Sequence, residues 1–271
     1  LFRFRMNNKI AIIGAGNLGL SLVKGLVHSK KYTSNQFNLS RRRIEKLQKM
    51  KEQGFNIFNN NSKAIENTKI IIISVLPQKI NEIFSELKPI LKNDQLIISL
   101  VSGVEISDII NIIGENNPII RAMPNTAISV RESMTCISTS HKWESYIKNA
   151  VEIFNQVGET TIINEEKMTS ATALCACGIA FFLRSIRAAS QGGNEIDFHS
   201  SEALKMAAQT AKGAAALLLQ NNSHPEDEID KVTSPKGCTI AGLNEMEHNG
   251  FSSAFIKGIK VSAEKAKNLY K

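Results

Sequence analysis

A glycine-rich stretch near the start of the chain constrains its fold more than any other feature. Residues Gly14–Gly19 read Gly-Ala-Gly-Asn-Leu-Gly and directly follow the short apolar run Lys9–Ile13. Apolar residues at helical spacing then occupy Leu18–Ser29, and a second short strand, Asn38-Leu39, is expected within about thirty residues. Such glycines also occur in ordinary loops, but the strand before them and the helix after them favour a loop that binds a dinucleotide.

Each glycine of this stretch has a separate expected role. Gly14 permits the tight turn, Gly16 lets the backbone approach a pyrophosphate, and Gly19 lets helix and strand pack closely. The helix that follows offers unpaired N–H groups to the anion. A purely structural glycine turn is the alternative. The predicted cofactor-binding residues here are Gly14, Ala15, Gly16, Asn17, Leu18 and Gly19.

The residues after the second strand discriminate between two cofactors. Sites for NAD usually place Asp or Glu there to accept a hydrogen bond from the ribose, whereas this chain has Ser40 followed by Arg41, Arg42 and Arg43. A 2′-phosphate would meet cations and a hydroxyl donor, so NADPH is favoured over NADH. The alternative, that the arginines only begin a solvated helix, applies best to Arg43. We expect Ser40, Arg41 and Arg42 to bind the cofactor.

The first ~165 residues alternate strand and helix patterns, which predicts an α/β fold with a doubly wound parallel sheet. Continuous apolar runs such as Lys69–Val75 are expected of parallel strands that are covered on both faces. Further strands are expected at Gln95–Val101, Pro118–Ala122 and Thr161–Asn164, and helices at Arg41–Gln53 and Gln78–Leu91.

Beyond Glu165 the chain carries long Ala-rich helical patterns and no convincing strand. These patterns cover Met168–Gln191, Ser200–Asn221 and Gly237–Tyr270. We therefore expect a dinucleotide-binding Rossmann domain over residues 6–164 and an all-helical domain over residues 165–271. Residues 1–5 are interpreted as an upstream extension, with Met6 as a natural start.

Composition argues against several classes of protein. The formal charge of +8 comes from scattered basic residues, with one Trp and three Tyr for base stacking, so a basic surface suited to an anionic ligand is favoured over nucleic-acid binding. The longest apolar run, Ser170–Leu183, ends at Arg184 and is too short for a membrane helix.

The histidines and cysteines do not indicate a metal site. His199, His224 and His248 do not pair at metal-ligand spacing, and the run Glu226–Asp230 is interpreted as a solvated acidic turn. No cysteine pair has the two-residue spacing of zinc or thioredoxin-like sites. Buried reduced thiols and a cytoplasmic location are therefore expected. The four cysteines are Cys136, Cys175, Cys177 and Cys238.

Two distant segments resemble signatures of the pyrroline-5-carboxylate reductase family, the enzymes that complete proline synthesis. The first is Arg121–Thr126 (Arg-Ala-Met-Pro-Asn-Thr). The second is Val232–Leu243, which is similar to the family's Ser-Pro-Gly-Gly-Thr-Thr-Ile loop except at Lys236 and Cys238. Their order, separation and the chain length also agree, so the resemblance extends from Met6 onward.

The chain departs from the family pattern in two further places. Val75-Leu76-Pro77 stands where the family usually has Val-Lys-Pro, which is expected to alter a contact near the cofactor. The family stretch Ser-Gly-Ser-Gly-Pro-Ala-Tyr appears here as Cys175–Phe181, reading Cys-Ala-Cys-Gly-Ile-Ala-Phe, and is expected to alter packing beside the substrate pocket. Neither change removes a group that the chemistry needs.

The resemblance implies NADPH-dependent hydride transfer to the cyclic imine of 1-pyrroline-5-carboxylate, giving L-proline. A protonated imine accepts hydride without a strong protein acid, so the protein must hold the carboxylate, align the ring and exclude water. The resemblance implies that Thr239 hydrogen-bonds the ring nitrogen and that Thr172 is a second catalytic candidate. Thr239 could instead satisfy the backbone of its own helix. The implied substrate-binding residues are Lys231, Ser234, Gly237, Cys238 and Thr239.

The resemblance also implies further cofactor contacts, most of them through the backbone. One group lies beneath the adenosine and phosphates, and a second lies near the nicotinamide. The first consists of Asn61, Val75, Leu76 and Pro77, and the second of Ser102, Gly103, Asn125 and Thr126.

Apolar helices such as Ala203–Leu219 suggest a homo-oligomer, and the family forms dimers or assemblies of dimers that share active sites between chains. Two rival functions remain open. One is an NADP-dependent reductase of another cyclic imine or of a β-hydroxyacid, for which Lys205 or Lys212 would be the available acid. The other is a non-catalytic NADP-sensing homologue.

Overall fold

The protein forms two compact units in the computed structural model, which describes residues 9–270. One unit is Leu1–Cys177 with Ser262–Lys271, and the other is Gly178–Val261. The expected domain boundary after Asn164 marks the change from strands to helices, but the first unit continues past it to Cys177 and regains the end of the chain. The expectations for residues 1–5 and Met6 lie outside the described residues.

The first unit is built on one eight-stranded sheet in the order β3-β2-β1-β4-β5-β6-β7-β8. The first six strands pair in parallel in the 3-2-1-4-5-6 order of dinucleotide-binding folds, which confirms the predicted fold class. The strands are β1 (Ile10–Ile13), β2 (Phe37–Ser40), β3 (Asn56–Phe58), β4 (Ile70–Ile73), β5 (Leu96–Ser99), β6 (Ile119–Met123), β7 (Ser133–Thr139) and β8 (Gly158–Ile162).

The far edge of the sheet differs from the sequence prediction. Strand β7 is antiparallel to β6, and β8 pairs in parallel with β7, so the sheet is not wholly parallel. Neither β3 nor β7 was expected, because their Asn, Ser and Thr residues lack the continuous apolar run of the central strands. Strand β8 lies earlier than the predicted range Thr161–Asn164.

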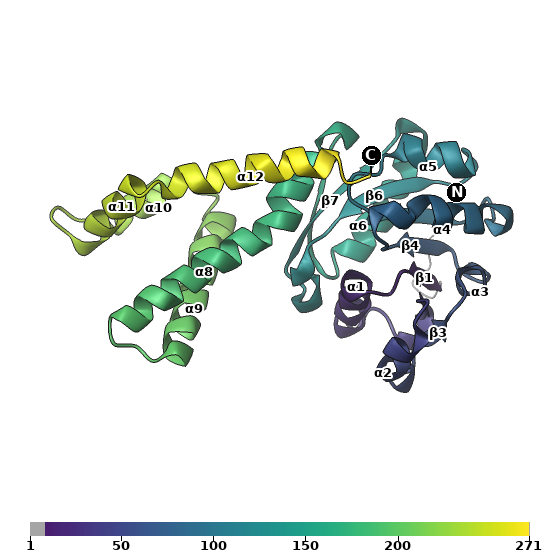
Figure 1. The fold of residues 1–271 in the computed structure, drawn as a ribbon, viewed down its shortest axis with the longest axis horizontal. Helices are drawn as coiled ribbons and strands as arrows, with labels where there is room; N and C mark the ends of the chain where they lie inside the picture. Colours follow the sequence, from purple (N-terminus) through teal and green to yellow (C-terminus); the bar gives the residue numbers. More distant parts are fainter. Residues whose placement is uncertain (1–8, 271) are drawn as a thin grey trace. The chain divides into compact units, whose positions relative to one another are not determined.

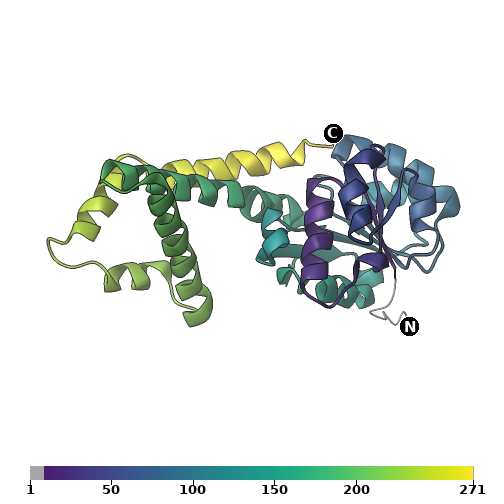
Figure 2. The same ribbon diagram turned by 90° about the horizontal axis from the view of Figure 1, so that it is seen from below.

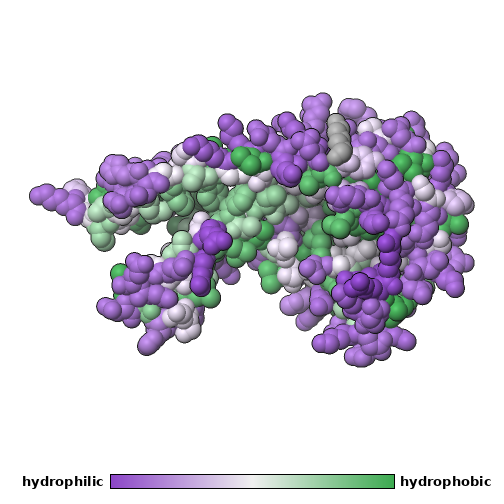
Figure 3. Space-filling view, in the orientation of Figure 1, coloured by the Kyte–Doolittle hydropathy of each residue, from purple (hydrophilic) through white to green (hydrophobic). Residues whose placement is uncertain are grey.

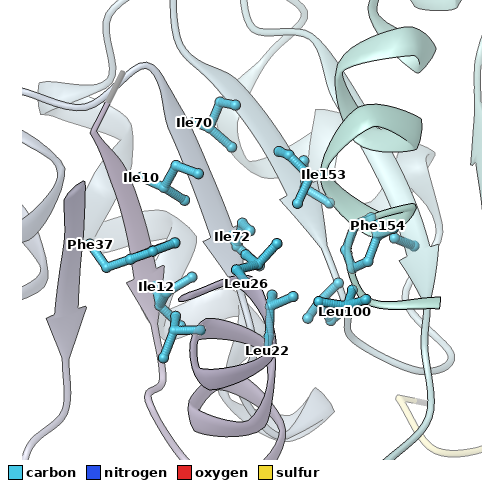
Figure 4. Packing of buried hydrophobic residues seen from close by; sticks show 14 of the residues in the cluster. Ile10, Ile12, Leu22, Leu26, Phe37, Ile70, Ile72, Leu100, Ile153 and Phe154 are labelled. Carbon is cyan, nitrogen blue, oxygen red and sulfur yellow. The ribbon is translucent and has the colours of Figure 1, made fainter. Parts of the chain in front are cut away.

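Helices cover both faces of this sheet (Figures 1 and 2). One face packs against α1 (Asn17–His28), α2 (Gln48–Glu52) and α6 (Ile147–Phe154), and the other against α3 (Asn61–Ile65), α4 (Ile80–Leu87) and α5 (Ile106–Ile113). Figure 4 shows part of the first cluster, where isoleucines of β1 and β4 meet Leu22 and Leu26 of α1. Both faces of β1 and β4 are therefore dry, as a parallel sheet requires.

The helices of this unit are shorter than predicted. The expected helix Arg41–Gln53 begins only with a 3₁₀ turn at Ile44–Leu47, which leads into α2. The expected helix Gln78–Leu91 contains α4 between 3₁₀ turns at Pro77–Lys79 and Lys88–Ile90, each of which has a proline in its first turn. Further 3₁₀ turns lie at Ser34–Gln36, Thr126–Val130, His141–Tyr146 and Glu165–Lys167.

After β8 the chain continues through consecutive short helical segments. After the turn Glu165–Lys167 come α7 (Met168–Ala171), a π-helical segment (Thr172–Cys177) and α8 (Gly178–Glu195). A π segment is rare and frequently accompanies a functional site.

The second unit is wholly helical, as predicted. Helices α8 and α9 (Ser200–Asn221) are followed by α10 (Pro225–Lys231), α11 (Cys238–His248) and α12 (Phe251–Lys267). The helix expected over Gly237–Tyr270 is divided by Asn249-Gly250, where Gly250 has φ +77°. A left-handed residue of this kind ends a helix, and glycine adopts it without strain.

Much of this unit's apolar surface is exposed. Among residues 178–261, only Gly178, Ser190 and Ala203 are buried. Phe181 and Phe182 of α8 pack on Phe255 of α12, and Figure 3 shows apolar surface over these helices.

Among the described residues one helical stretch, Glu165–Glu195, is long and apolar enough to cross a membrane by length and composition alone.

Candidate active site

The glycine loop lies where the strand order reverses, between β1 and β4. Gly14 has φ +87°, and a Cβ atom there would lie 2.5 Å from the Ser74 carbonyl oxygen and 2.5 Å from Val75 Cγ1. Only glycine fits both the dihedral angle and this approach. The loop after β4, which contains the predicted residue Val75, therefore borders the glycine turn.

The other two glycines differ in their surroundings. A Cβ on Gly19 would lie 2.9 Å from Ile12 Cγ2, so Gly19 allows α1 to pack tightly on β1, as expected. A Cβ on Gly16 would meet only the Gly14 carbonyl oxygen, at 3.8 Å. The space around Gly16 is open enough for a ligand to approach the backbone.

The start of α1 is suited to an anion. Gly16 is its N-cap, no side chain caps the helix, and Asn17 at its first position is exposed. The N–H groups of Gly14 and Ala15 are already used, because both donate to the Ser40 carbonyl oxygen, at 3.1 and 2.9 Å. The N–H groups of the first helical turn thus remain for a phosphate.

Ser40, Arg41 and Asn61, which are predicted to bind the cofactor, are connected to the glycine loop and to one another by hydrogen bonds. The Ser40 hydroxyl donates to Asn61 Oδ1 (2.6 Å), and Arg41 Nη1 donates to the Ala15 carbonyl oxygen (3.2 Å). Asn61 Nδ2 donates to Glu86 Oε2 (2.8 Å), which fixes the amide. Arg41 still has free guanidinium donors for a ligand, because Nη1 supplies only one of its five.

Arg42, the next residue in the chain, is exposed and pairs with Glu82 of α4. Lys79 Nζ lies 3.1 Å from the same carboxylate. The hydrogen bond from Lys79, followed by that from Arg42, holds the pKa of Glu82 below its usual value. The two cations share one carboxylate, so this cluster keeps excess positive charge where a 2′-phosphate was expected.

Leu76 and Pro77 follow β4 and are at least partly exposed. Leu76 is 71% exposed, and Pro77 begins the turn Pro77–Lys79. The exposed leucine occupies the position where the resembled family usually has lysine. It therefore offers an apolar contact in place of a charge.

Ser102 and Gly103 follow β5. The Ser102 hydroxyl lies 3.7 Å from the Met123 sulfur. Gly103 has φ +76°, and a Cβ there would lie 3.1 Å from the Ala266 carbonyl oxygen. Gly103 thus packs against the end of the chain, where Tyr270 also donates to Asn81 Oδ1 (2.8 Å). Sequence reasoning had not foreseen this contact.

Asn125 and Thr126 follow β6. Asn125 Oδ1 accepts from the Ala127 N–H (3.0 Å), and Asn125 Nδ2 donates to the Cys175 carbonyl oxygen (3.2 Å). Thr126 is exposed at the start of the next turn. Asn125 therefore connects the β6 loop to the π-helical segment.

Thr172 begins the π-helical segment and is buried. Its hydroxyl donates to the Met168 carbonyl oxygen (2.9 Å), so its proton is occupied within the helix. Only the oxygen lone pairs of Thr172 remain to accept a further hydrogen bond.

Sequence reasoning missed an ion pair between the buried Arg121 of β6 and the partly exposed Glu165. Arg121 Nη1 lies 2.9 Å from Glu165 Oε1, which also accepts the Ile106 N–H at 2.7 Å. The charged Arg121 within an apolar strand was the available signal, since buried charges are normally paired. The pair fixes the start of the helical stretch to β6 and α5.

The candidate substrate loop lies in the second unit. The Gly237 N–H donates to the Ser234 carbonyl oxygen (2.9 Å), and a Cβ on Gly237 would lie 2.5 Å from Ser234 Oγ. Lys236, where the family has glycine, adopts φ +60°. Gly237 is the N-cap of α11 and no side chain caps that helix, so Cys238 and Thr239 lie in its first turn.

Lys231 lies at the end of α10, and its Nζ is 2.8 Å from Glu228 Oε1. The hydrogen bond from Lys231 keeps the pKa of Glu228 below its usual value. The structure therefore groups Ser234, Gly237, Cys238 and Thr239 at one helix start, whereas Lys231 is engaged with its own helix.

No group of three or more His, Cys, Asp or Glu side chains suited to a metal ion occurs among the described residues. His224 instead accepts a hydrogen bond from the Glu226 N–H (3.3 Å) at the start of α10.

Two family models match the chain in consecutive regions. Residues 9–103 match the model described as NADP oxidoreductase coenzyme F420-dependent. Residues 165–269 match the model described as pyrroline-5-carboxylate reductase dimerisation. The second match shows that the helical half is a dimerisation region.

Similar proteins cover almost the whole chain. Pyrroline-5-carboxylate reductase 2 of Dictyostelium discoideum is 51% identical over 96% of this chain and 92% of its own length. Pyrroline-5-carboxylate reductase 1 of the same organism is 49% identical over 97% of this chain, which spans half the length of that relative. The crystal structure of Plasmodium falciparum pyrroline carboxylate reductase with NADP bound covers 99% of this chain and is itself covered completely, with a TM-score of 0.90 and 24% identity. That structure shows the same fold.

Proposed function

Since the chain belongs to the pyrroline-5-carboxylate reductase family, we propose that it reduces 1-pyrroline-5-carboxylate to L-proline with NADPH. This would be the last step of proline biosynthesis. The observation that carries the proposal is 51% identity to a named reductase across 92% of that relative. The chain spans half the length of a second named reductase from the same organism, so the activity of the whole protein is proposed for this chain.

The first unit fits a dinucleotide at the glycine loop. Gly14, Gly16 and Gly19, with Ala15, Asn17 and Leu18, would hold the pyrophosphate at the start of α1. When bound, NADPH supplies the hydride. Backbone groups of Val75–Pro77 and of Ser102, Gly103, Asn125 and Thr126 would contact the rest of the cofactor.

The side chains of Ser40, Arg41, Arg42 and Asn61 support a preference for NADPH. Arg41 carries positive charge beside the loop, Arg42 follows it in the chain, and no carboxylate occupies the end of β2 to accept from a ribose hydroxyl. Charge-assisted hydrogen bonds to a 2′-phosphate are about twice as strong as neutral ones. NADH would bind, but less well.

The loop Ser234–Thr239 would hold the substrate. Backbone N–H groups around Gly237 and Cys238 suit its carboxylate, and the Thr239 hydroxyl suits its ring nitrogen. The Ser234 hydroxyl supports the turn, and Lys231 contributes positive charge from the end of α10. Thr172 is the second hydroxyl that we assign to the reaction, where it accepts rather than donates.

We assign the chemistry itself to position rather than to acid catalysis. An iminium carbon is already electrophilic, so the protein must align it and exclude water. Neither metal nor a strong acid is needed for this step. The Cys175–Phe181 departure leaves this assignment intact, because no hydroxyl lost there carries a required proton.

The dimerisation region supports a homodimer, or an assembly of dimers, as the working state. A second copy of the chain is the partner that we propose for the exposed apolar residues of the second unit. Neither nucleic acid nor a membrane is part of the proposal, and the apolar stretch Glu165–Glu195 is assigned to the dimer. Four free cysteines suit a cytoplasmic location.

The functional division that we propose is residues 6–164 for the cofactor and 165–271 for substrate binding and dimerisation. The family matches support a division here, because one ends at residue 103 and the other starts at residue 165.

The test is NADPH oxidation with a panel of substrates. We expect turnover with 1-pyrroline-5-carboxylate that exceeds turnover with other cyclic imines and with β-hydroxyacids, and a lower KM for NADPH than for NADH. Intact NADPH binding without turnover of 1-pyrroline-5-carboxylate would contradict the proposal. Turnover of another member of the panel would identify one of the rival reductases.

A further inference from the structure

Cys136 and Cys175 lie against each other in the first unit. Their sulfur atoms are 3.8 Å apart and share a hydrogen bond. Cys136 lies on β7 and is 3% exposed, whereas Cys175 lies in the π-helical segment and is half-buried. Both pack in one small apolar cluster with Met123 and Met168. The fold thus brings together two thiols from distant parts of the chain.

The sequence sets Cys175 apart in the same way. In the stretch Cys175–Phe181, the resembled family begins with serine, which cannot form a disulfide. Cys177, two residues further, makes no hydrogen bond to another thiol among the described residues, so only one of the two substituted thiols faces a second thiol. The pair is therefore a property of this chain rather than of the family signature.

The two thiols differ in acidity. The hydrogen bond from the Cys136 thiol lowers the pKa of Cys175 to about 7. That same hydrogen bond, followed by burial, raises the pKa of Cys136. The lowered pKa of Cys175 favours its thiolate, which is the nucleophilic form, while the raised pKa of Cys136 favours its protonated thiol. The more accessible sulfur is thus the reactive one, and the buried sulfur adjoins it.

We propose that Cys136 and Cys175 form a reversible disulfide when the protein meets hydrogen peroxide. The Cys175 thiolate attacks one peroxide oxygen and the O–O bond breaks. Hydroxide is released, and Cys175 becomes a sulfenic acid. The Cys136 sulfur then attacks the Cys175 sulfur, loses its proton and displaces hydroxide. Two thiols lose two electrons and two protons, and one peroxide becomes two waters.

The movement that the cross-link requires is small. A disulfide is about 2.05 Å long, so the sulfur atoms must approach by about 1.8 Å from their present 3.8 Å. Side-chain rotation at Cys175, which lies in the half-buried π-helical segment, is the motion available for this approach.

We expect the cross-link to displace Asn125, which is hydrogen-bonded to Cys175. The Cys175 carbonyl oxygen accepts the Asn125 amide hydrogen bond, and Met123 packs in the same cluster as both cysteines. If the proposed function holds, on which this consequence alone rests, the β6 loop contacts the cofactor. Misplacing it would slow turnover by up to about 100-fold.

The experiment treats the full chain with hydrogen peroxide at neutral pH, alkylates the remaining thiols and maps the peptides by mass spectrometry. We expect a linked Cys136–Cys175 peptide pair, a mass about 2 Da lower before alkylation, and reversal by dithiothreitol. The Cys177→Ser variant should form the link as the unmodified chain does. The Cys136→Ser variant should not, but dimedone should trap a sulfenic acid at Cys175.

Full alkylation of both cysteines after peroxide treatment would overturn the proposal, as would a link that uses Cys177 instead. Peptide mapping reads the link without any assay of turnover, so it stands even if the proposed reductase activity fails. A link that forms while NADPH oxidation keeps its rate would overturn the coupling to Asn125.

Discussion

The two compact units differ in how far they bury their apolar side chains. In the first unit, two apolar clusters fill both faces of the sheet, and strands such as β1 and β4 are buried along their whole length. In the second unit only three residues are buried, although its helices are rich in alanine, leucine and phenylalanine. Large side chains that are exposed there include Phe182, Leu183, Leu204, Leu217 and Leu219.

This difference in burial indicates which unit is stabilised within one chain and which unit depends on a partner. Burial of apolar surface contributes about 25 cal/mol per Å², so the first unit has its stabilising core within one chain. We propose that the second unit gains that contribution by associating with a second copy of the chain, as in obligate dimers. The nucleotide loop should therefore be robust in the monomer, and the substrate loop should depend on the dimer.

The largest expected effect comes from charging the apolar surface of the second unit. Leu183 and Leu219 are 58% and 85% exposed in the single chain. In the double variant Leu183→Asp/Leu219→Asp, each chain would have to bury two unpaired carboxylates on forming a dimer. We expect sedimentation to show monomer and NADPH oxidation to fall more than about 100-fold.

The matched control is Ile90→Asp, which charges an exposed apolar residue of the first unit. It should leave the dimer and the activity unchanged. A double variant that remains dimeric would contradict the assignment of this surface to a second copy.

Next in size is Gly14→Ala, which tests whether the first unit holds the cofactor. The new Cβ would meet the Ser74 carbonyl oxygen and Val75, in a backbone conformation that costs a non-glycine residue about 1–3 kcal/mol. We expect NADPH binding, measured by fluorescence titration, to weaken by about 100-fold or more.

Gly114→Ala provides a control for the backbone conformation alone. Gly114 has φ +85°, close to that of Gly14, but a Cβ there would meet nothing within 4 Å. This variant should lose some thermal stability and keep its affinity for NADPH. Equal losses of affinity in both variants would show that strain, and not the phosphate turn, is responsible.

A smaller effect is expected from Thr239→Ala, which tests the second unit's part in the reaction. Losing a hydrogen bond to a charged ring should cost about 1.5–3 kcal/mol, or about 10- to 100-fold in kcat/KM for 1-pyrroline-5-carboxylate. NADPH affinity should not change. Thr239→Ser keeps the hydroxyl and should restore most of the rate, whereas an unaltered rate in the alanine variant would refute the role of Thr239.

The smallest of these effects concerns cofactor choice. Arg42→Ala removes one of two cations beside Glu82, and we expect the KM for NADPH to rise about tenfold while that for NADH stays the same. Arg43→Ala is the neighbouring control, since Arg43 is exposed and makes no described ion pair. Parallel changes for both cofactors would exclude a 2′-phosphate contact at Arg42.

Sequence patterns predicted the centre of the sheet better than its edges. The runs around Ile70–Ile73 and Leu96–Ser99 are apolar because helices cover both faces, and that burial is legible in one segment at a time. Strand β7 is made of Ser, Met, Thr and Cys residues with one Ile, and its antiparallel place depends on pairing with β6, which local pattern does not encode.

The same contrast holds for the candidate site. The roles of Gly14 and Gly19 followed from spacing, because a turn and a close approach are local demands. The engagement of Glu165 with Arg121, the approach of Gly103 to Ala266 and the meeting of Cys136 with Cys175 are long-range contacts. They arise from packing, so local patterns do not identify the partners, although a charged Arg121 within an apolar strand signals that it has one. The roles of Thr172, Thr239 and Lys231 remain predictions.

The most direct test of the proposed reaction follows the hydride itself. The protein is incubated with 1-pyrroline-5-carboxylate and NADPH that carries deuterium at the transferable position, and the product is analysed by mass spectrometry and NMR. We expect L-proline with one deuterium on the δ-carbon, formed in equal amount to the NADPH consumed. Proline without deuterium, or NADPH consumption without proline, would contradict it.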